Sequence, residues 1–168
     1  MMTRLSRSLL PLLIISTSAS LLSGCQTNMT VTQGLSNRQI AVLKQQGFVP
    51  TSRGWSFSMD DRLLFAINDA TINADEATSI SHIASALLGV GIDRARIEGY
   101  ADDTGTEEYN EALSQRRAQA VANVIVLSGF SAANLSVLGL GERDPVESNQ
   151  TAAGRQQNRR VVILISAS

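Results

Sequence analysis

The chain has 168 residues, with 14 basic and 15 acidic side chains, one histidine and one cysteine. A formal net charge of −1 gives no basic surplus for nucleic acid, and a lone cysteine forms no internal disulfide. Neither a histidine- or cysteine-rich metal motif nor a glycine-rich phosphate loop after a strand is present, so we expect no metal and no cofactor.

The first 24 residues have the three zones of an export signal. Arg4 and Arg7 precede an apolar run over 9–15, and small residues end the segment. A membrane-spanning helix needs about 20 uninterrupted apolar residues, whereas Pro11 breaks a run that is already short. We therefore predict a cleaved signal peptide over residues 1–24.

The residues LSGC at 22–25 decide the type of signal. A large residue and two small ones before Cys25 resemble the lipobox of bacterial lipoproteins, which implies acylation of Cys25 as the new N-terminus. Gln26 after the cysteine resembles lipoproteins forwarded to the outer membrane. A free structural thiol is the alternative, but several acyl chains on Cys25 would hold the protein firmly at a membrane.

Removal of the signal leaves 144 residues with 12 basic and 15 acidic side chains, a net charge near −3, enough for one domain. Residues 25–35 are polar and aperiodic, which favours a flexible tether. A short amphipathic helix is expected from Ser36 to Gln46, with Ser36 or Asn37 as cap, and residues 36–54 form an N-terminal helix and linker. The sequence leaves the oligomeric state open, a homodimer included.

Residues 55–168 form the main domain, in which strands and helices alternate. The first pair of expected strands begins just before this range, near Phe48. The expected elements are two short strands between Phe48 and Leu64, a helix capped by Asn73 and ended by Gly89, a strand over 92–98, a helix over 106–128, and strands over 135–140 and 160–165. This order predicts an α/β (α+β) sandwich with helices packed on one face of a mixed sheet.

An arginine interrupts the apolar stripe of the helix over 106–128. Arg117 falls among the residues that helical spacing places on one face, namely Tyr109, Leu113, Ala120, Val121, Val124 and Leu127. A buried arginine needs a partner, so Arg117 either pairs with an acid inside the fold or receives an anion in a pocket.

Two adjacent acids, Asp102 and Asp103, precede the same helix, where a strand end meets a helix N-terminus. The alternative is that Asp102 or Asp103 only caps the helix. Together, an aspartate on the loop and Arg117 on the helix suit a ligand with an ammonium and a carboxylate, because arginine binds carboxylates through a planar fork.

The strings IEGYADDTGTEEYNEALSQRRAQAV, GLGERDP and GRQQNRRVVI resemble the peptidoglycan-associated OmpA-like domain over most of residues 55–166. The resemblance implies that Asp102 and Arg117 clasp the diaminopimelate of peptidoglycan, with Asp103 beside them and with Gly105, Asn110 and Leu113 shaping the loop and helix. The departures from the family pattern are Tyr100, Ala101 and Asp103.

The strings CQT, GLSNRQIAVLKQQGF and GWSF resemble outer-membrane lipoproteins of a cyclic-di-GMP signalling system. The resemblance implies a periplasmic partner, the repressor YfiR, whose sequestration would release an inner-membrane diguanylate cyclase. Ile40, Leu43, Phe48 and Trp55 are apolar anchors for such a partner. Alternatively they pack on the domain itself, and a switch could use both states.

Two other functions compete with this interpretation. An enzyme could use Asp102 with Asp103 or Glu107 as acid and base on a glycan, but His82 lies away from the apolar side of its helix and no cysteine remains as nucleophile, so we expect no catalysis. The other competing function is a purely mechanical link between lipid and cell wall.

Three basic residues lie near the last strand, namely Arg155, Arg159 and Arg160. They could line the pocket, but we expect them to serve the loop over 141–158.

Overall fold

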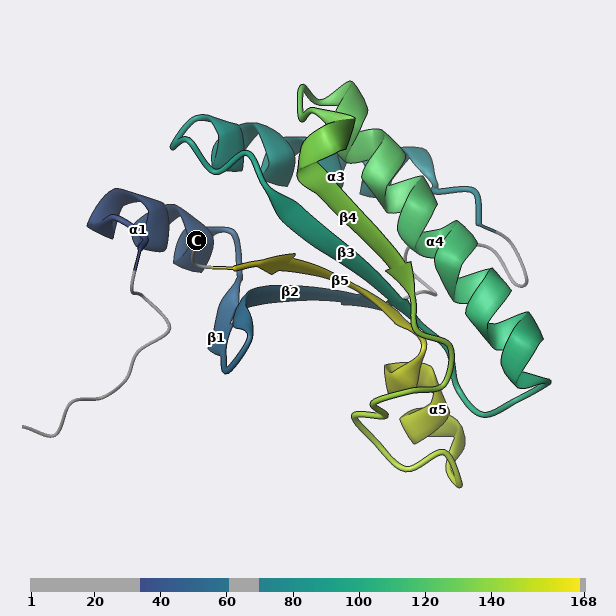
Figure 1. The fold of residues 1–168 in the computed structure, drawn as a ribbon. Helices are drawn as coiled ribbons and strands as arrows, with labels where there is room; N and C mark the ends of the chain where they lie inside the picture. Colours follow the sequence, from purple (N-terminus) through teal and green to yellow (C-terminus); the bar gives the residue numbers. More distant parts are fainter. Residues whose placement is uncertain (1–33, 61–69, 167–168) are drawn as a thin grey trace, which may run out of the picture.

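The computed structural model describes residues 34–60 and 70–166, and its centre is a five-stranded mixed sheet (Figure 1). The strand order is β1-β2-β5-β3-β4, and only β3 and β4 run parallel among these neighbours. The strands are β1 (Val49–Thr51), β2 (Gly54–Asp60), β3 (Ala95–Tyr100), β4 (Leu135–Gly139) and β5 (Arg160–Ile165). The sheet and its helices confirm the predicted α+β fold class.

Helices α3 (Ala74–Leu88) and α4 (Glu107–Leu127) pack on one face of the sheet. Helix α1 (Asn37–Gln45) lies beside the C-terminal end of β5, while α5 (Ala152–Asn158) precedes β5 and a 3-10 turn (Ala132–Asn134) precedes β4. Local chemistry explains the helix starts, because the side chain of Ser36, Asn73 or Thr106 accepts a backbone N–H three residues on. The predicted caps Ser36 and Asn73 are confirmed.

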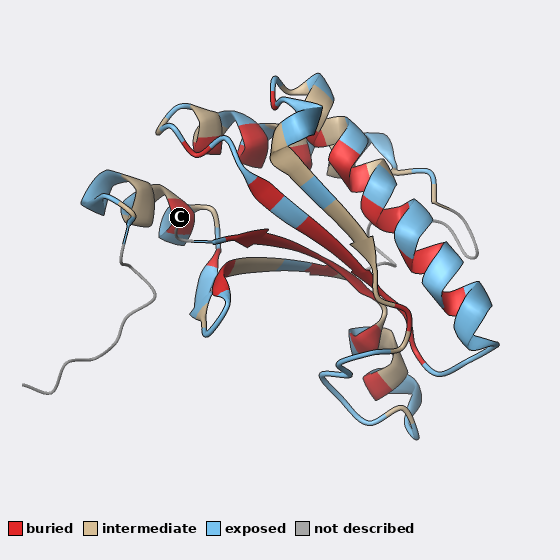
Figure 2. Ribbon diagram, viewed as in Figure 1, coloured by how far each residue is buried: buried red, intermediate tan, exposed pale blue. Residues whose placement is uncertain are grey.

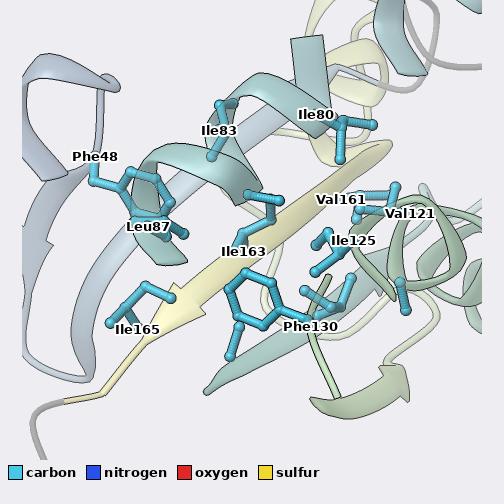
Figure 3. Close-up of a cluster of buried hydrophobic side chains, with 14 of the residues drawn as sticks. Phe48, Ile80, Ile83, Leu87, Val121, Ile125, Phe130, Val161, Ile163 and Ile165 are labelled. Atoms are coloured by element: carbon cyan, nitrogen blue, oxygen red, sulfur yellow. The ribbon is translucent and has the colours of Figure 1, made fainter. Parts of the chain in front are cut away.

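The core lies between the sheet and the two long helices (Figure 3). Val161, Ile163 and Ile165 of β5 point into it, and all six residues of β5 are buried (Figure 2). Leu43 of α1 and Phe48 before β1 belong to the same cluster, with side chains 0% and 3% exposed. The segment over 36–54 therefore shares the core of the rest of the domain.

The buried face of α4 differs from the predicted stripe. Tyr109 is 46% exposed and Leu127 is 87% exposed. The buried residues are Asn110, Leu113, Ser114, Arg117, Ala118, Val121, Ala122 and Ile125. The cause is that the backbone of α4 approaches the sheet closely at two strand glycines, Gly99 and Gly139. A Cβ at Gly99 would lie 2.1 Å from the Ser114 carbonyl oxygen, so small and polar residues of α4 face the sheet there.

Several expectations lie outside the described residues, among them the signal peptide over 1–24, Cys25, and the apolar residues 63–65 expected in a strand. Within the described ranges, no helix has the length and apolarity that a membrane span requires. His82 is exposed on α3, as its helical position predicts. The strand expected over 92–98 begins later, at Ala95, and runs to Tyr100.

Candidate functional site

The loop between β3 and α4 holds Asp102 in a buried position. Asp102 is 6% exposed, and its Oδ1 accepts the backbone N–H of Thr104 at 2.9 Å. Gly105 follows with φ +105°, a left-handed conformation that glycine adopts without steric cost. The cap of α4 is Thr106, so the alternative that Asp102 or Asp103 caps this helix is wrong. Asp103 is exposed.

Asn110 fastens this loop to the first turns of α4. Its Nδ2 donates to the backbone oxygen of Asp102 at 3.1 Å and to Glu142 Oε2 at 3.4 Å. A second loop closes the same side, because Gly141 accepts the backbone N–H of Ala101 at 2.7 Å and donates its own N–H to Ser114 Oγ at 3.0 Å. Both loops and the helix therefore hold one fixed arrangement around Asp102.

Arg117 lies on the same face of α4 as Asn110 and Ser114, since residues three, four and seven apart share a helical face. Arg117 is 5% exposed, which confirms a charge in the middle of the buried face. Seven residues of helix separate Asn110 and Arg117 by about 10 Å. Side chains on a helix lean toward its N-terminus, and for Arg117 this is the direction of Asn110 and the Asp102 loop.

Arg159 takes the role that the sequence interpretation considered but did not favour. We expected it to serve the loop over 141–158, but its Nη1 forms an ion pair with Asp102 Oδ2. The reason is sheet register: β5 pairs antiparallel with β3, and Tyr100 lies opposite Arg160, so the residue before β5 arrives beside the residues after β3. A basic residue just before the central strand was the available signal.

The ionisation of Asp102 reflects these contacts. Burial favours the neutral carboxyl, but the Thr104 backbone N–H and the Arg159 guanidinium outweigh burial and hold the pKa of Asp102 below its usual range. At neutral pH the loop therefore presents a carboxylate, with one oxygen bound by Thr104 and the other by Arg159.

The other two arginines of this region follow the prediction. Arg155 donates to the backbone oxygen of Asn149 at 2.7 Å, within the loop. Arg160 donates to the backbone oxygens of Asn158 and Asp144 at 3.1 and 2.9 Å. Arg160 also stacks its guanidinium 3.7 Å from the centre of the Tyr100 ring.

The four predicted partner anchors lie together near α1, away from this loop. Leu43, Phe48 and Trp55 are 0%, 3% and 1% exposed, and Ile40 is partly buried and packs against the core cluster to which they belong. Phe48 also contacts Phe57, with ring centroids 5.4 Å apart. In this structure the anchors therefore pack on the domain itself, which was one of the two alternatives.

The order of strands and helices, together with the polar β3–α4 junction, defines an α+β domain of the OmpA-like class. The family model described as "OmpA family" matches residues 64–159, and the chain belongs to that family.

Among known proteins, the chain is 49% identical to the "Outer-membrane lipoprotein YfiB" of Pseudomonas aeruginosa, over 87% of this chain and 86% of that protein. It is 36% identical to a lipoprotein YfiB of Escherichia coli, over 87% of this chain and 90% of the relative. Among solved structures, the peptidoglycan-associated lipoprotein of Burkholderia pseudomallei superposes with a TM-score of 0.56 at 29% identity, covering 64% of this chain and 87% of that one.

These relatives confirm the expected resemblance and the expected localisation. The protein is an outer-membrane lipoprotein that faces the periplasm. Acylation at Cys25, which lies outside the described residues, stays a prediction.

Proposed function

We propose that this protein binds peptidoglycan non-covalently by clasping the free end of diaminopimelate. In this proposal Asp102 receives the ammonium group and Arg117 receives the carboxylate. The observation that carries it is a buried carboxylate, kept ionised, on a loop fastened to the helix that bears a buried arginine. Asn110 and Gly105 maintain the shape of that loop, and Asp103 lies exposed at its rim.

The chemistry of the two groups explains why diaminopimelate fits. Its side-chain terminus carries an ammonium and a carboxylate on one carbon, whereas a lysine side chain ends in the ammonium only. A carboxylate offers about four lone-pair sites, so Asp102 can accept a ligand ammonium beside the N–H groups of Thr104 and Arg159. The planar fork of arginine suits the ligand carboxylate.

The proposal concerns binding, without bond cleavage. The Burkholderia relative is named a peptidoglycan-associated lipoprotein, which supports the choice of ligand. With Cys25 acylated, a tether of about ten residues reaches roughly 35 Å, so the domain can meet the cell wall while its lipid stays in the outer membrane. Release of soluble fragments from purified peptidoglycan would overturn the binding interpretation in favour of an enzyme.

The test is co-sedimentation of the full-length lipoprotein, in detergent, with purified peptidoglycan. Arg117→Lys keeps the positive charge but loses the fork, so we expect most of the sedimented protein to be lost while circular dichroism stays unchanged. Arg117→Ala should give the same loss. Unfolding of Arg117→Ala, together with normal sedimentation of Arg117→Lys, would instead support an internal ion pair and contradict the clasp.

We further propose that the protein regulates cyclic-di-GMP signalling by sequestering the periplasmic repressor YfiR, which relieves an inner-membrane diguanylate cyclase. The likeness to two proteins named YfiB extends through the N-terminal segment and supports this role. The apolar anchors Leu43, Phe48 and Trp55 are the expected contact, covered at rest and offered in an active state. Within the described residues, Trp55 Nε1 is buried without a hydrogen-bond partner, which weakens the resting contact.

Capture of YfiR by variants of the full-length lipoprotein tests this second proposal. Trp55→Phe retains an aromatic ring and removes the buried N–H group, so it should shift the balance between the covered and offered states and change the amount of YfiR captured. Leu43→Ala should change capture as well. If both variants capture YfiR as the wild type does, the anchors are only part of the core.

A purely mechanical tether between outer membrane and cell wall is the alternative. Because residues 36–54 share the core, deleting them would disturb the fold, and exposed positions give a cleaner test. Reversing two exposed charges on α1, with Arg38→Glu and Lys44→Glu, should lower cyclic-di-GMP under envelope stress if α1 meets the repressor. Unchanged cyclic-di-GMP in these variants and in Trp55→Phe would favour the mechanical tether.

A further inference from the structure

A row of polar side chains lies on the sheet face opposite α3 and α4. Successive residues of a strand point to opposite faces. Ile97 of β3 points into the core, so Glu98 and Tyr100 both point to the opposite face of the sheet. Glu98 and Tyr100 are each only 1% exposed. Among the described residues, arginine side chains contribute to this cover: Arg53 contacts Glu98, and Arg160 stacks on Tyr100.

The contacts in this row are close and directional. Arg53 Nη1 lies 2.9 Å from both carboxylate oxygens of Glu98, and the Tyr100 hydroxyl donates to Glu98 Oε2 at 2.7 Å. Arg53 Nη2 also reaches the Tyr100 hydroxyl at 3.5 Å. Burial, followed by the hydrogen bond to Glu98, raises the pKa of Tyr100, so its hydroxyl remains a donor at neutral pH.

One end of the row reaches the candidate peptidoglycan site. Tyr100 is two residues before Asp102, and Arg160 follows Arg159, which forms the ion pair with Asp102. Tyr100 and Arg160 are also paired across the sheet. The segment that carries Asp102 and the segment that carries Arg159 therefore both adjoin the stacked pair of Tyr100 and Arg160.

The other end reaches the N-terminal segment. Arg53 lies in the turn between β1 and β2, two residues before Trp55 and within residues 36–54. Its side chain is 50% exposed, whereas Glu98 is 1% exposed. Removing the guanidinium would leave a buried carboxylate with less compensation, and Tyr100 would have to adjust, since its hydroxyl binds that carboxylate.

We infer that Arg53, Glu98, Tyr100 and Arg160 act as positioning residues for Asp102, so that the β1–β2 turn and the peptidoglycan-binding loop are coupled. The inference rests on the proposed function, because it needs Asp102 to bind the cell-wall peptide. A row that served stability only would leave ligand affinity unchanged when its outer member, Arg53, is altered. A positioning row transmits that change to Asp102 through Glu98 and Tyr100.

The experiment measures binding of a tripeptide ending in meso-diaminopimelate to the full-length lipoprotein in detergent, by calorimetry. Arg53→Gln is the decisive variant, because Arg53 is half-exposed on a turn and does not contact Asp102. We expect about 2- to 30-fold weaker binding for Arg53→Gln and for Tyr100→Phe. Arg94→Gln, at another exposed arginine, is the matched control and should bind within about twofold of the wild type.

Two further readouts separate positioning from stability. Trp55 is the single tryptophan, two residues from Arg53, so its fluorescence should shift when the tripeptide binds the wild type and shift less in Tyr100→Phe. The double variant Arg53→Gln/Tyr100→Phe should bind about as weakly as the weaker single variant, because residues in one network are not additive. Additive losses would contradict a shared row.

The possible failures are distinguishable. No binding of the tripeptide by the wild type would overturn the proposed function and this inference with it. Normal wild-type binding with an unchanged affinity in Arg53→Gln would overturn the positioning role and leave the clasp in place.

Discussion

Replacing Asp102 by asparagine removes one charge from the candidate site while keeping its shape. Asparagine also forms the turn in which a side-chain oxygen accepts the N–H two residues on, so the bond from Thr104 should remain. Asp102 is 6% exposed, and truncating one partner of such a buried ion pair costs about 2–5 kcal/mol. Arg159 already compensates part of the charge, which favours the lower half of this range, or about 30- to 300-fold weaker binding.

Calorimetry with the diaminopimelate tripeptide measures this loss of affinity. A tripeptide ending in lysine is the control ligand and should bind weakly to every variant. Asp103→Asn makes the same chemical change one residue away at an exposed position. Exposed charges contribute about 0.2–1 kcal/mol, so Asp103→Asn should weaken binding at most about fivefold. Equal losses in the two variants would mean that general charge, and not a clasp at Asp102, attracts the peptide.

Three further predictions concern pH and stability. Because the pKa of Asp102 is lowered in the folded state, the stability that its ion pair contributes is complete above the ordinary aspartate pKa and is lost as the pH falls through the lowered value. Sedimentation with peptidoglycan should therefore persist down to about pH 4. A loss of sedimentation centred at about pH 6 would refute this reasoning. Gly99→Ala places a Cβ against the Ser114 carbonyl oxygen and should lower unfolding free energy by at least about 1–3 kcal/mol in urea titrations. Leu43→Ala should cost about 2–5 kcal/mol, whereas an unchanged melting temperature would mean that α1 is independent of the core.

Local signals predicted much of the fold. Ser36 and Asn73 cap their helices where the sequence placed them, and β5 has the expected bounds Arg160–Ile165. These features depend on residues that are close together in the sequence, so the sequence alone is enough to predict them. The positions of Asp102 and Arg117 in the fold were predictable for the same reason, since they lie on one loop and on the helix that follows it.

The errors arose where distant segments meet. The buried face of α4 depends on Gly99 and Gly139, which let the helix backbone approach the sheet, and helical periodicity contains no information about them. Arg159 reaches Asp102 because β5 pairs with β3, a register that the order of elements does not reveal. Hydrophobic pattern therefore located the elements, while sheet pairing decided which polar groups came together.

The covered state of the N-terminal anchors limits how a partner can use them. Leu43, Phe48 and Trp55 are almost fully buried, and exposing such side chains costs about 1.5–3 kcal/mol each, or about 5–9 kcal/mol together. At the lower bound only about one molecule in several thousand would offer them at rest. The Trp55 N–H, which has no hydrogen-bond partner among residues 34–60 and 70–166, reduces this cost by about 1–3 kcal/mol. A partner that binds the released segment must therefore supply the remaining free energy, or the row from Arg53 to Tyr100 must transmit part of it from the bound cell wall.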